Sequence, residues 1–292
     1  MLKQALRLSN GLEMPRIGLG TGMLNNAKAI ENAIVNVGYR NIDAASIMQN
    51  EKVVGKAIKK AIDQGAVARE DLFVASKLWH SSYDDPEQAL NQSLEKLGLE
   101  YLDMYYVHWP NALFTQSKLP MHEIWQSMEM LIYSGKVRSL AISNFNLAMT
   151  ADLLTYAHVK PVCNQICLNP QCAQEDLVRF LLDQDVIPIA YSPLGRVGSK
   201  SGPVGTDITG DSLFGGLAQK YGKTPSQVIL NWGLSRGYCI IPKAQQEAHQ
   251  AENFAAQDFE LEPKEVKAIT EKFDERKYLY LHTHDSEYNV FA

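Results

Sequence analysis

Residues 41–78 decide the fold and read NIDAASIMQNEKVVGKAIKKAIDQGAVAREDLFVASKL. The stretch opens with a short strand-like run, Asn41–Asp43, continues with a helical pattern over Lys52–Gln64, and closes with a second run, Leu72–Leu78. Near-continuous apolar runs are expected when both faces of a parallel sheet are covered by helices. The order strand, helix, strand therefore predicts one unit of an α/β fold.

The same alternation continues along the whole chain. Further strands are expected at Arg16–Gly20, Leu102–His108, Ser139–Ser143, Val162–Ile166, Ile187–Tyr191 and Cys239–Ile241. The helices between strands are expected at Ala27–Val37, Pro86–Leu97, His122–Ser134, Ala148–Ala157, Gln174–Asp183, Asp211–Tyr221, Pro225–Arg236 and Gln246–Ala255. Eight strands that alternate with helices favour a closed (β/α)8 TIM barrel over an open sheet.

The chain is expected to form a single domain over residues 1-292, because no Pro-, Gly- or Ser-rich linker divides it. An N-terminal β-hairpin is predicted around Asn10-Gly11, with Leu6–Leu8 and Leu12–Met14 as its strands. This hairpin would plug one end of the barrel. It is followed directly by the first predicted barrel strand.

Composition excludes several classes of partner. The net charge is −5, hydrophobic residues make up 46% and charged residues 21%. Without a basic block there is no footprint for nucleic acid. No apolar stretch approaches the ~20 residues of a membrane span, and the N-terminus lacks the apolar region of a secretory signal. We expect a cytoplasmic monomer.

Four cysteines raise the question of a metal site. Cys163 and Cys167 are four residues apart and Cys172 follows closely, which would suit zinc if a matching pair lay downstream. They flank an apolar strand-like run, and Cys239 stands alone. Buried, reduced thiols are the favoured interpretation, so no metal is expected and a reducing compartment fits best.

Three predicted strands end in ionisable residues. Asp43 and His108 each close a strand-like run and Lys77 lies near the end of another, and parallel barrel strands carry their chemistry at their C-terminal ends. Asp43 and Lys77 alone could be a structural ion pair, and His108 alone could be a core histidine. Together, the three residues indicate a shared site, in which Asp43 is expected to keep Lys77 protonated.

Eight motifs, in order along the chain, include these three residues and extend the pattern. They are Gly18–Thr21, Gly38–Glu51, Ser76–Trp79, Leu102–Pro110, Gly135–Arg138 with Ser143–Phe145, Asn164-Gln165, Ala190–Gly195, and Ile241–Lys243 with Glu252-Asn253. The chain resembles the aldo-keto reductases, of the aldose or aldehyde reductase kind, over nearly its whole length. The resemblance implies NADPH-dependent reduction of a small aldehyde or ketone to an alcohol.

The resemblance also implies roles for individual residues. The catalytic group would be Asp43, Met48, Lys77 and His108, and the substrate pocket would include Gly22, Trp79 and Trp109. The cofactor would be bound by Thr21, Asp43, Ser143, Asn144, Gln165, Tyr191, Ser192, Leu194, Lys243, Ala244, His249, Glu252 and Asn253. In this scheme Tyr191 stacks on the nicotinamide, Ser143, Asn144 and Gln165 hold its carboxamide, and Lys243 binds the adenosine 2′-phosphate.

The departures from the family pattern bear most directly on function. Met48 stands where the family has a tyrosine whose hydroxyl protonates the substrate oxygen, and a thioether has no proton to give. Gly22 replaces a tryptophan that often walls the pocket. Ala244 and His249 replace a serine and an arginine near the 2′-phosphate, which would soften the preference for NADPH over NADH.

Two functions follow from these departures. The first is carbonyl reduction weakened by loss of the general acid, with His108, Lys77, a water molecule or Tyr83 as the substitute proton donor. The second is a catalytically inactive NADPH-binding barrel that acts as a sensor or scaffold. A deliberate substitution at Met48 is a third reading. The substrate would be chosen by the loops 111–120 and 199–210 and by the tail 275–292.

Overall fold

The computed structural model describes residues 4–110, 117–195 and 207–273. Eight parallel strands run in sequential order around one sheet. They are β3 Gly18–Gly20, β4 Asn41–Asp43, β5 Phe73–Leu78, β6 Met104–Val107, β7 Leu140–Ser143, β8 Cys163–Cys167, β9 Ile187–Tyr191 and β10 Cys239–Ile240. A parallel bridge between Ile17 and Ile240 joins the last strand to the first, and the Ile240 amide donates to the Arg16 carbonyl at 2.9 Å. The predicted (β/α)8 barrel is confirmed.

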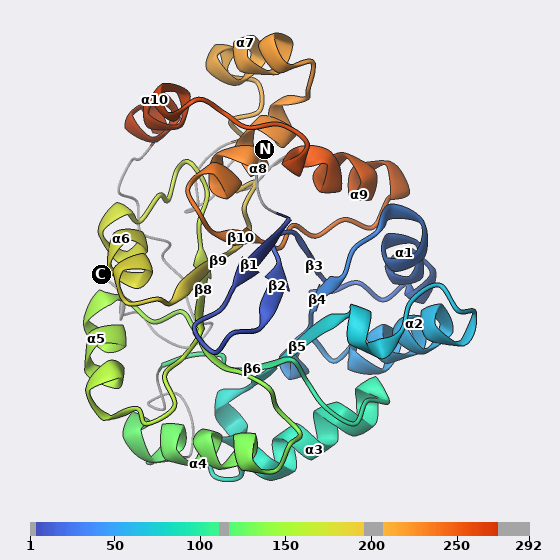
Figure 1. Cartoon of the computed structure of the whole chain (residues 1–292), viewed down its shortest axis with the longest axis vertical. Helices are drawn as coiled ribbons and strands as arrows, with labels where there is room; N and C mark the ends of the chain where they lie inside the picture. The colour runs from blue at the N-terminus through green and yellow to red at the C-terminus, as the bar shows by residue number, and fades with distance from the viewer. Residues whose placement is uncertain (1–3, 111–116, 196–206, 274–292) are drawn as a thin grey trace.

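The helices form a ring outside the strands (Figure 1). They are α1 Ala27–Asn32, α2 Glu51–Asp63, α3 Pro86–Leu97, α4 Met121–Tyr133, α5 Leu147–Tyr156, α6 Glu175–Asp183, α7 Ser212–Tyr221, α8 Pro225–Ser235, α9 Glu247–Phe254 and α10 Pro263–Phe273. Helix α10 was not predicted, and the others match their predicted positions closely.

The first predicted helix is helical over its whole predicted range, Ala27–Val37, but its hydrogen bonding changes within it. Its α-helical hydrogen bonding ends at Asn32, and residues Ala33–Val37 form a π-helical turn. The amide of Gly38 donates to the Ala33 carbonyl, five residues back, with Gly38 at φ 103°. A glycine reaches this left-handed conformation without a steric penalty, so the wide turn can end there and lead directly into β4.

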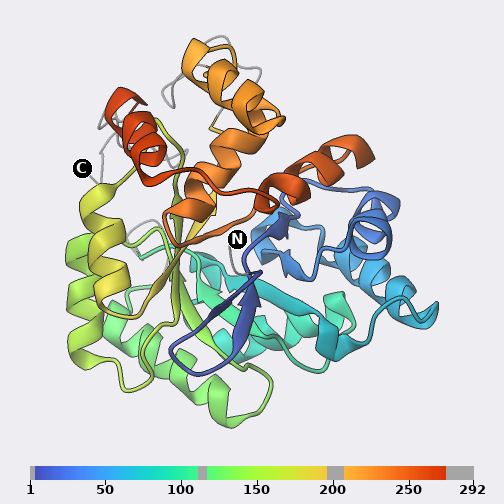
Figure 2. The ribbon, with the colours of Figure 1, turned by 45° about the horizontal axis from the view of Figure 1, so that its top comes forward.

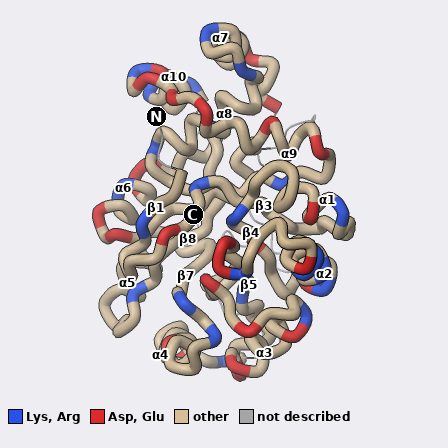
Figure 3. Tube along the Cα trace, turned by 45° about the vertical axis from the view of Figure 1, so that its right-hand side comes forward, with Lys and Arg blue, Asp and Glu red and all other residues tan. Residues whose placement is uncertain are grey.

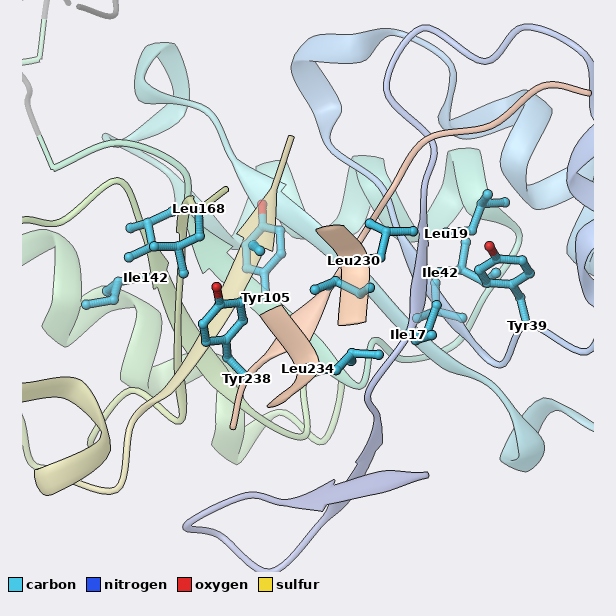
Figure 4. Packing of buried hydrophobic residues seen from close by; sticks show 14 of the residues in the cluster. Ile17, Leu19, Tyr39, Ile42, Tyr105, Ile142, Leu168, Leu230, Leu234 and Tyr238 are labelled. Carbon is cyan, nitrogen blue, oxygen red and sulfur yellow. The ribbon is translucent and has the colours of Figure 1, made fainter. Parts of the chain in front are cut away.

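Period-two alternation within each strand creates two apolar layers. In β5, Val74 and Leu78 point outward into the core between strands and helices, whereas Phe73 and Ala75 point into the barrel. Figure 4 shows part of the outer layer, where strand residues meet Leu230 and Leu234 of α8. Because side chains alternate along a strand, Lys77 lies on the inward side with Phe73 and Ala75, nearest the C-terminal end.

The N-terminal hairpin closes the opposite end of the barrel. Strands β1 Ala5–Arg7 and β2 Glu13–Pro15 pair in antiparallel fashion and lie across the barrel axis (Figures 1 and 2). Leu8 and Met14 are 2% and 0% exposed and belong to the inner apolar cluster. The Asn10 side-chain amide donates to Ser139 Oγ at 2.9 Å, just before β7. The predicted plug is confirmed.

Parts of the expected substrate loops and tail lie outside the described residues, namely 111–116, 196–206 and 274–292. The expectation that residues 1-292 form one domain therefore stays a prediction. Among the residues described, the helices include none that combines the length and apolar character needed to cross a membrane.

We predict that Met14→Ala lowers the free energy of unfolding by about 2–5 kcal/mol, because it leaves a cavity in the barrel floor. Met130→Ala is the matched control: Met130 is 64% exposed, and its loss should change stability by no more than about 0.5 kcal/mol. Urea unfolding followed by circular dichroism measures both. Equal stabilities would show that the hairpin does not seal the barrel.

Candidate active site

A buried ion pair joins the ends of β4 and β5. Lys77 Nζ donates to Asp43 Oδ1 at 2.5 Å and to the Ala44 carbonyl at 2.9 Å. The second carboxylate oxygen of Asp43 accepts from Gln165 Nε2 of β8 at 2.8 Å. Lys77 is 2% and Asp43 8% exposed, so both charges lie in a low-dielectric environment where pairing is essential. The predicted convergence of these two residues is present in the structure.

The pKa of Lys77 is lowered, although Asp43 acts to raise it, as the sequence predicts. Burial is the main cause, and it outweighs the opposing effects of Asp43 and Glu51, whose charges raise the pKa. The ammonium also lies over the ring of Tyr106, 5.0 Å from its centroid. Burial removes water from all sides of the ammonium, which lowers its pKa. The Asp43 carboxylate stabilises the ammonium from one side, so it raises the pKa by a smaller amount.

His108 follows β6 at the same end of the barrel, where its amide donates to the Leu78 carbonyl at 3.1 Å. The pKa of His108 is well below the usual value, first because of burial and then because of the charges of Lys77 and His80. Its ring meets Trp79 edge-on, with centroids 5.0 Å apart. A neutral imidazole can donate a hydrogen bond to a carbonyl oxygen, but it is a poor source of a proton.

Polar side chains from three strands form a platform beside this trio. Ser143 Oγ donates to the Gln165 carbonyl at 2.8 Å, and Asn144 Nδ2 donates to the His108 carbonyl at 2.9 Å. Tyr191, at the end of β9, donates its hydroxyl hydrogen to Asn144 Oδ1 at 2.9 Å. Asn144 adopts φ 63°, a left-handed conformation that asparagine tolerates. The platform is therefore held rigidly by its own hydrogen bonds.

The ion pair, His108 and the platform share one cavity of about 480 Å³. Its lining is Gly20, Gly22, Met23, Asp43, Ala44, Ala45, Ile47, Met48, Lys77, Trp79, His108, Trp109, Ser143, Asn144, Gln165, Tyr191, Ser192, Ile241 and Lys243. This set includes the four catalytic residues expected from the sequence. It also includes the three expected pocket residues.

Met48 lies in a 3₁₀ turn, Ser46–Met48, at the edge of the cavity. A Cβ added at Gly22 would be 3.6 Å from the Met48 terminal methyl, so the thioether covers space next to the glycine. Met23, Ile47 and Met48 are 74%, 37% and 40% exposed. Together they give the cavity an apolar rim, of which the sequence pattern indicated only Met48 beside Gly22.

Several expected cofactor residues do not line this cavity. The Thr21 hydroxyl donates to the Asp43 carbonyl at 2.8 Å and so supports the site from behind. Leu194, Ala244, His249, Glu252 and Asn253 lie after β9 or on the segment from β10 through α9. The Glu252 carboxylate accepts from Thr224 Oγ1 at 2.6 Å. Their proposed roles toward the adenosine half of NADPH stay predictions.

The cysteines do not lie in the cavity lining. All four are buried free thiols, and burial raises the pKa of Cys163 well above its usual value. The thiolate is the form that binds a metal, and burial disfavours it. Within the described part of the chain, no group of three or more His, Cys, Asp and Glu residues is arranged to hold a metal ion.

A larger surface depression, about 1190 Å³, lies between α6, α8 and α10, remote from the ion pair. Its charged residues are largely paired: Arg236 contacts Glu175, and Lys267 lies 3.5 Å from Glu271. Figure 3 shows acidic and basic positions interleaved on α10. With its charges compensated and its shape open, this depression offers no set of polar groups converging on a ligand.

Residues 16–274 match the model of the Aldo/keto reductase family. The chain belongs to the aldo/keto reductase family. It is 36% identical over 286 residues to an aldose reductase of Encephalitozoon cuniculi, covering 92% of this chain and 93% of the relative. It is 37% identical over 276 residues to a methylglyoxal reductase of Salmonella typhimurium, covering 94% of each.

The fold agrees with a solved structure of the same family. An aldo-keto reductase of Bombyx mori, in complex with NADP, superposes with a TM-score of 0.88 at 34% identity. The match covers 95% of this chain and 94% of the Bombyx chain. The family and the fold indicate NADP as the cofactor of this aldo/keto reductase.

The pKa of His108 should rise in Lys77→Met, because a positive neighbour is removed and Asp43 is left unpaired nearby. NMR titration of the imidazole signals measures the shift. Lys60→Met is the control, since Lys60 pairs with Glu31 on the surface. An unchanged His108 midpoint in Lys77→Met would contradict the electrostatic coupling.

Proposed function

We propose that this aldo/keto reductase uses NADPH to reduce a small aldehyde or ketone to an alcohol, at a rate limited by the lack of a phenol at position 48. The observation that carries the proposal is the convergence of the Lys77–Asp43 pair, His108 and the Ser143–Asn144–Gln165 platform on one cavity. The expected cytoplasmic location and monomeric state stay predictions.

The residues present fit a nicotinamide dinucleotide. Ser143, Asn144 and Gln165 offer amide and hydroxyl groups for the carboxamide, and Tyr191 offers a ring beside them. A Cβ at Gly20 would be 2.7 Å from the Ile241 carbonyl, so glycine allows the segment that carries Lys243 to approach closely. When bound, NADPH supplies a hydride.

Lys243 is the cation best placed for the 2′-phosphate. It lies at the cavity edge, is exposed, and makes no ion pair with the residues that the structure describes. Ala244 and His249 stand where a hydroxyl and a guanidinium would strengthen phosphate binding. The selectivity for NADPH over NADH therefore depends mainly on a single ammonium group.

His108 would orient the substrate by donating a hydrogen bond to its carbonyl oxygen, as its low pKa requires. Trp79 and Trp109 would exclude water from the reacting carbon. The rim of Met23, Ile47 and Met48 favours apolar or aromatic aldehydes over polyhydroxylated sugars, since its side chains are flexible or apolar and carry no hydrogen-bond donor. An assay should therefore begin with apolar aldehydes.

The second function, NADPH binding without catalysis, is favoured by one observation, the absence of a hydroxyl at Met48. It predicts that NADPH binds tightly while no aldehyde increases its oxidation above the rate without protein. The first function predicts measurable turnover with the same cofactor affinity. Two parallel measurements separate the two functions. NADPH fluorescence gives the cofactor affinity, and the absorbance of the reduced nicotinamide gives the rate of NADPH oxidation.

Met48→Tyr is expected to increase kcat about 10²-fold or more, because a phenol near Lys77 would restore general acid catalysis. Met48→Phe is the matched control, since it adds the same ring without the hydroxyl and should stay near the wild-type rate. Steady-state reduction of an aromatic aldehyde measures both. Equal gains in the two variants would attribute the effect to ring packing.

Lys243→Met should weaken NADPH binding about 10-fold or more, the loss expected when a charged hydrogen-bond partner is removed. NADH binding should be nearly unchanged, because NADH lacks the 2′-phosphate. Lys52→Met, on the exposed side of α2, controls for a general change in charge. Fluorescence titration gives the affinities of wild type and both variants for each nucleotide. Equal losses for both nucleotides would place Lys243 elsewhere on the cofactor.

A further inference from the structure

One N–H of the Lys77 ammonium has no hydrogen-bond acceptor among the described residues. An ammonium group carries three N–H donors. Among the described residues two acceptors take two of them, Asp43 Oδ1 at 2.5 Å and the Ala44 carbonyl at 2.9 Å. The third N–H has no such partner, and Lys77 is part of the cavity lining. A charged donor is therefore available where the substrate carbonyl would lie.

We propose that Lys77 itself protonates the substrate oxygen in this protein, through its third N–H and without an intervening phenol. This inference rests on the proposed carbonyl reduction and names its proton source. Position 48 holds a side chain with no proton, at the rim of the same cavity. The substrate oxygen and the ammonium can then meet directly.

Neighbouring groups from two strands fix the position of the ammonium. Asp43 and Ala44 hold it from the end of β4, and Gln165 fixes the far oxygen of that carboxylate. The ring of Tyr106 supports it from β6, one inward-facing position before His108. A lysine side chain is flexible when free, so this support is what would give its remaining N–H a defined direction.

The proposed step balances in atoms and electrons. The carbonyl carbon gains a hydride with two electrons from NADPH, and the C=O π bond breaks onto oxygen. The Lys77 N–H bond then breaks as the alcohol O–H bond forms, which leaves a neutral amine. Water in the cavity returns a proton to Lys77 before the next turnover. No further oxidant or reductant is needed.

Burial makes Lys77 a better acid than an exposed lysine would be, because it lowers the pKa of the ammonium. The charged and titratable groups that face it are Asp43 on β4, Glu51 at the start of α2, and Tyr106 and His108 on or just after β6. The two carboxylates oppose the shift and burial prevails. His108 stays neutral and cannot compete as an acid.

Two phenols outside the cavity lining, Tyr83 and Tyr106, are poorly placed to donate, and the hydroxyl of Tyr191, which lies in the lining, already donates its hydrogen to Asn144 Oδ1. Tyr83 is fully buried and donates its hydroxyl hydrogen to the Trp109 carbonyl, and burial raises its pKa. Tyr106 is 2% exposed, and its hydroxyl interacts with Gln165 while burial raises its pKa strongly. Neither belongs to the cavity lining. The idea that Tyr83 replaces the missing tyrosine is therefore not supported.

The test compares Lys77→Arg with Tyr106→Phe. Arginine keeps the charge and the pairing with Asp43, but it does not lose its proton below about pH 12. Tyr106→Phe keeps the ring under the ammonium and removes the phenol. For each protein, aldehyde reduction is measured between about pH 6 and pH 10, the range below the free-lysine pKa. NADPH fluorescence titration confirms that the cofactor still binds.

A direct readout of Lys77 accompanies the kinetics. The ε-carbon signal of Lys77 in isotopically labelled, cofactor-free protein is assigned by its loss in Lys77→Arg and titrated by NMR. We expect a midpoint below the ~10.4 of a free lysine. Wild-type reduction should decline as pH rises through the same region. Lys77→Arg should lose about 10²-fold or more in kcat and lack this decline, whereas Tyr106→Phe should keep it at the same pH.

Four results would overturn the inference. A Lys77→Arg enzyme with the wild-type rate and pH profile would assign the proton to water or His108. A Tyr106→Phe enzyme that lost the alkaline decline would assign it to Tyr106. A Lys77 midpoint at or above that of free lysine would remove the acid. If neither wild type nor Met48→Tyr reduced any aldehyde, the proposed function itself would fail. The other three results would leave the proposed function in place and contradict only the role of Lys77.

Discussion

The ion pair between Lys77 and Asp43 is the interaction on which the rest of this site depends. Two opposite charges, almost completely removed from water, are tolerated only when each satisfies the other and the remaining polar atoms find partners. Asp43 meets this requirement through Gln165, and Lys77 through the Ala44 carbonyl. Removing either charge would leave the other buried and uncompensated, at a cost of about 3–5 kcal/mol. The pair therefore fixes how β4, β5 and β8 are placed relative to one another at the cavity.

The barrel accommodates this pair at the C-terminal ends of its strands. Below that level the inner layer is apolar, with Phe73, Ala75 and Met104 facing the axis. The hairpin covers the other end with Leu8 and Met14 and so keeps water from the floor. Above that level the strands end, and the ion pair, His108 and the platform face the open cavity. Alternation along each strand and closure of the sheet thus produce one polar layer on an apolar base.

Within this frame, Met48 changes the chemistry without changing the charges. The thioether lies at the rim beside Gly22 and adds apolar surface, while the buried pair behind it keeps its hydrogen bonds. By the family resemblance, a phenol at this position would be the group that gives its proton to the substrate. Without it, the electrostatic consequences of burying Lys77 act directly on whatever occupies the cavity. The desolvation that makes the lysine costly to bury also lowers the pKa of its ammonium, so the ammonium releases a proton more readily.

The sequence by itself determined the order of strands and helices, the hairpin, and the residues that end β4, β5 and β6, because all of these are local patterns of apolar spacing and turn residues. It also determined the family, through motifs in a fixed order. It missed α10 and the π-helical turn at Ala33–Val37, since hydrogen-bond register within a helix depends on packing against neighbours.

Only the tertiary structure decided the direction of the Lys77 pKa, because desolvation sums over every element around the ammonium, whereas the sequence shows one neighbour at a time. It also decided that Tyr106 supports the lysine, that the Tyr83 hydroxyl donates to the Trp109 carbonyl, and that Met23 and Ile47 join Met48 at the rim. Those facts depend on which distant segments meet when the barrel closes.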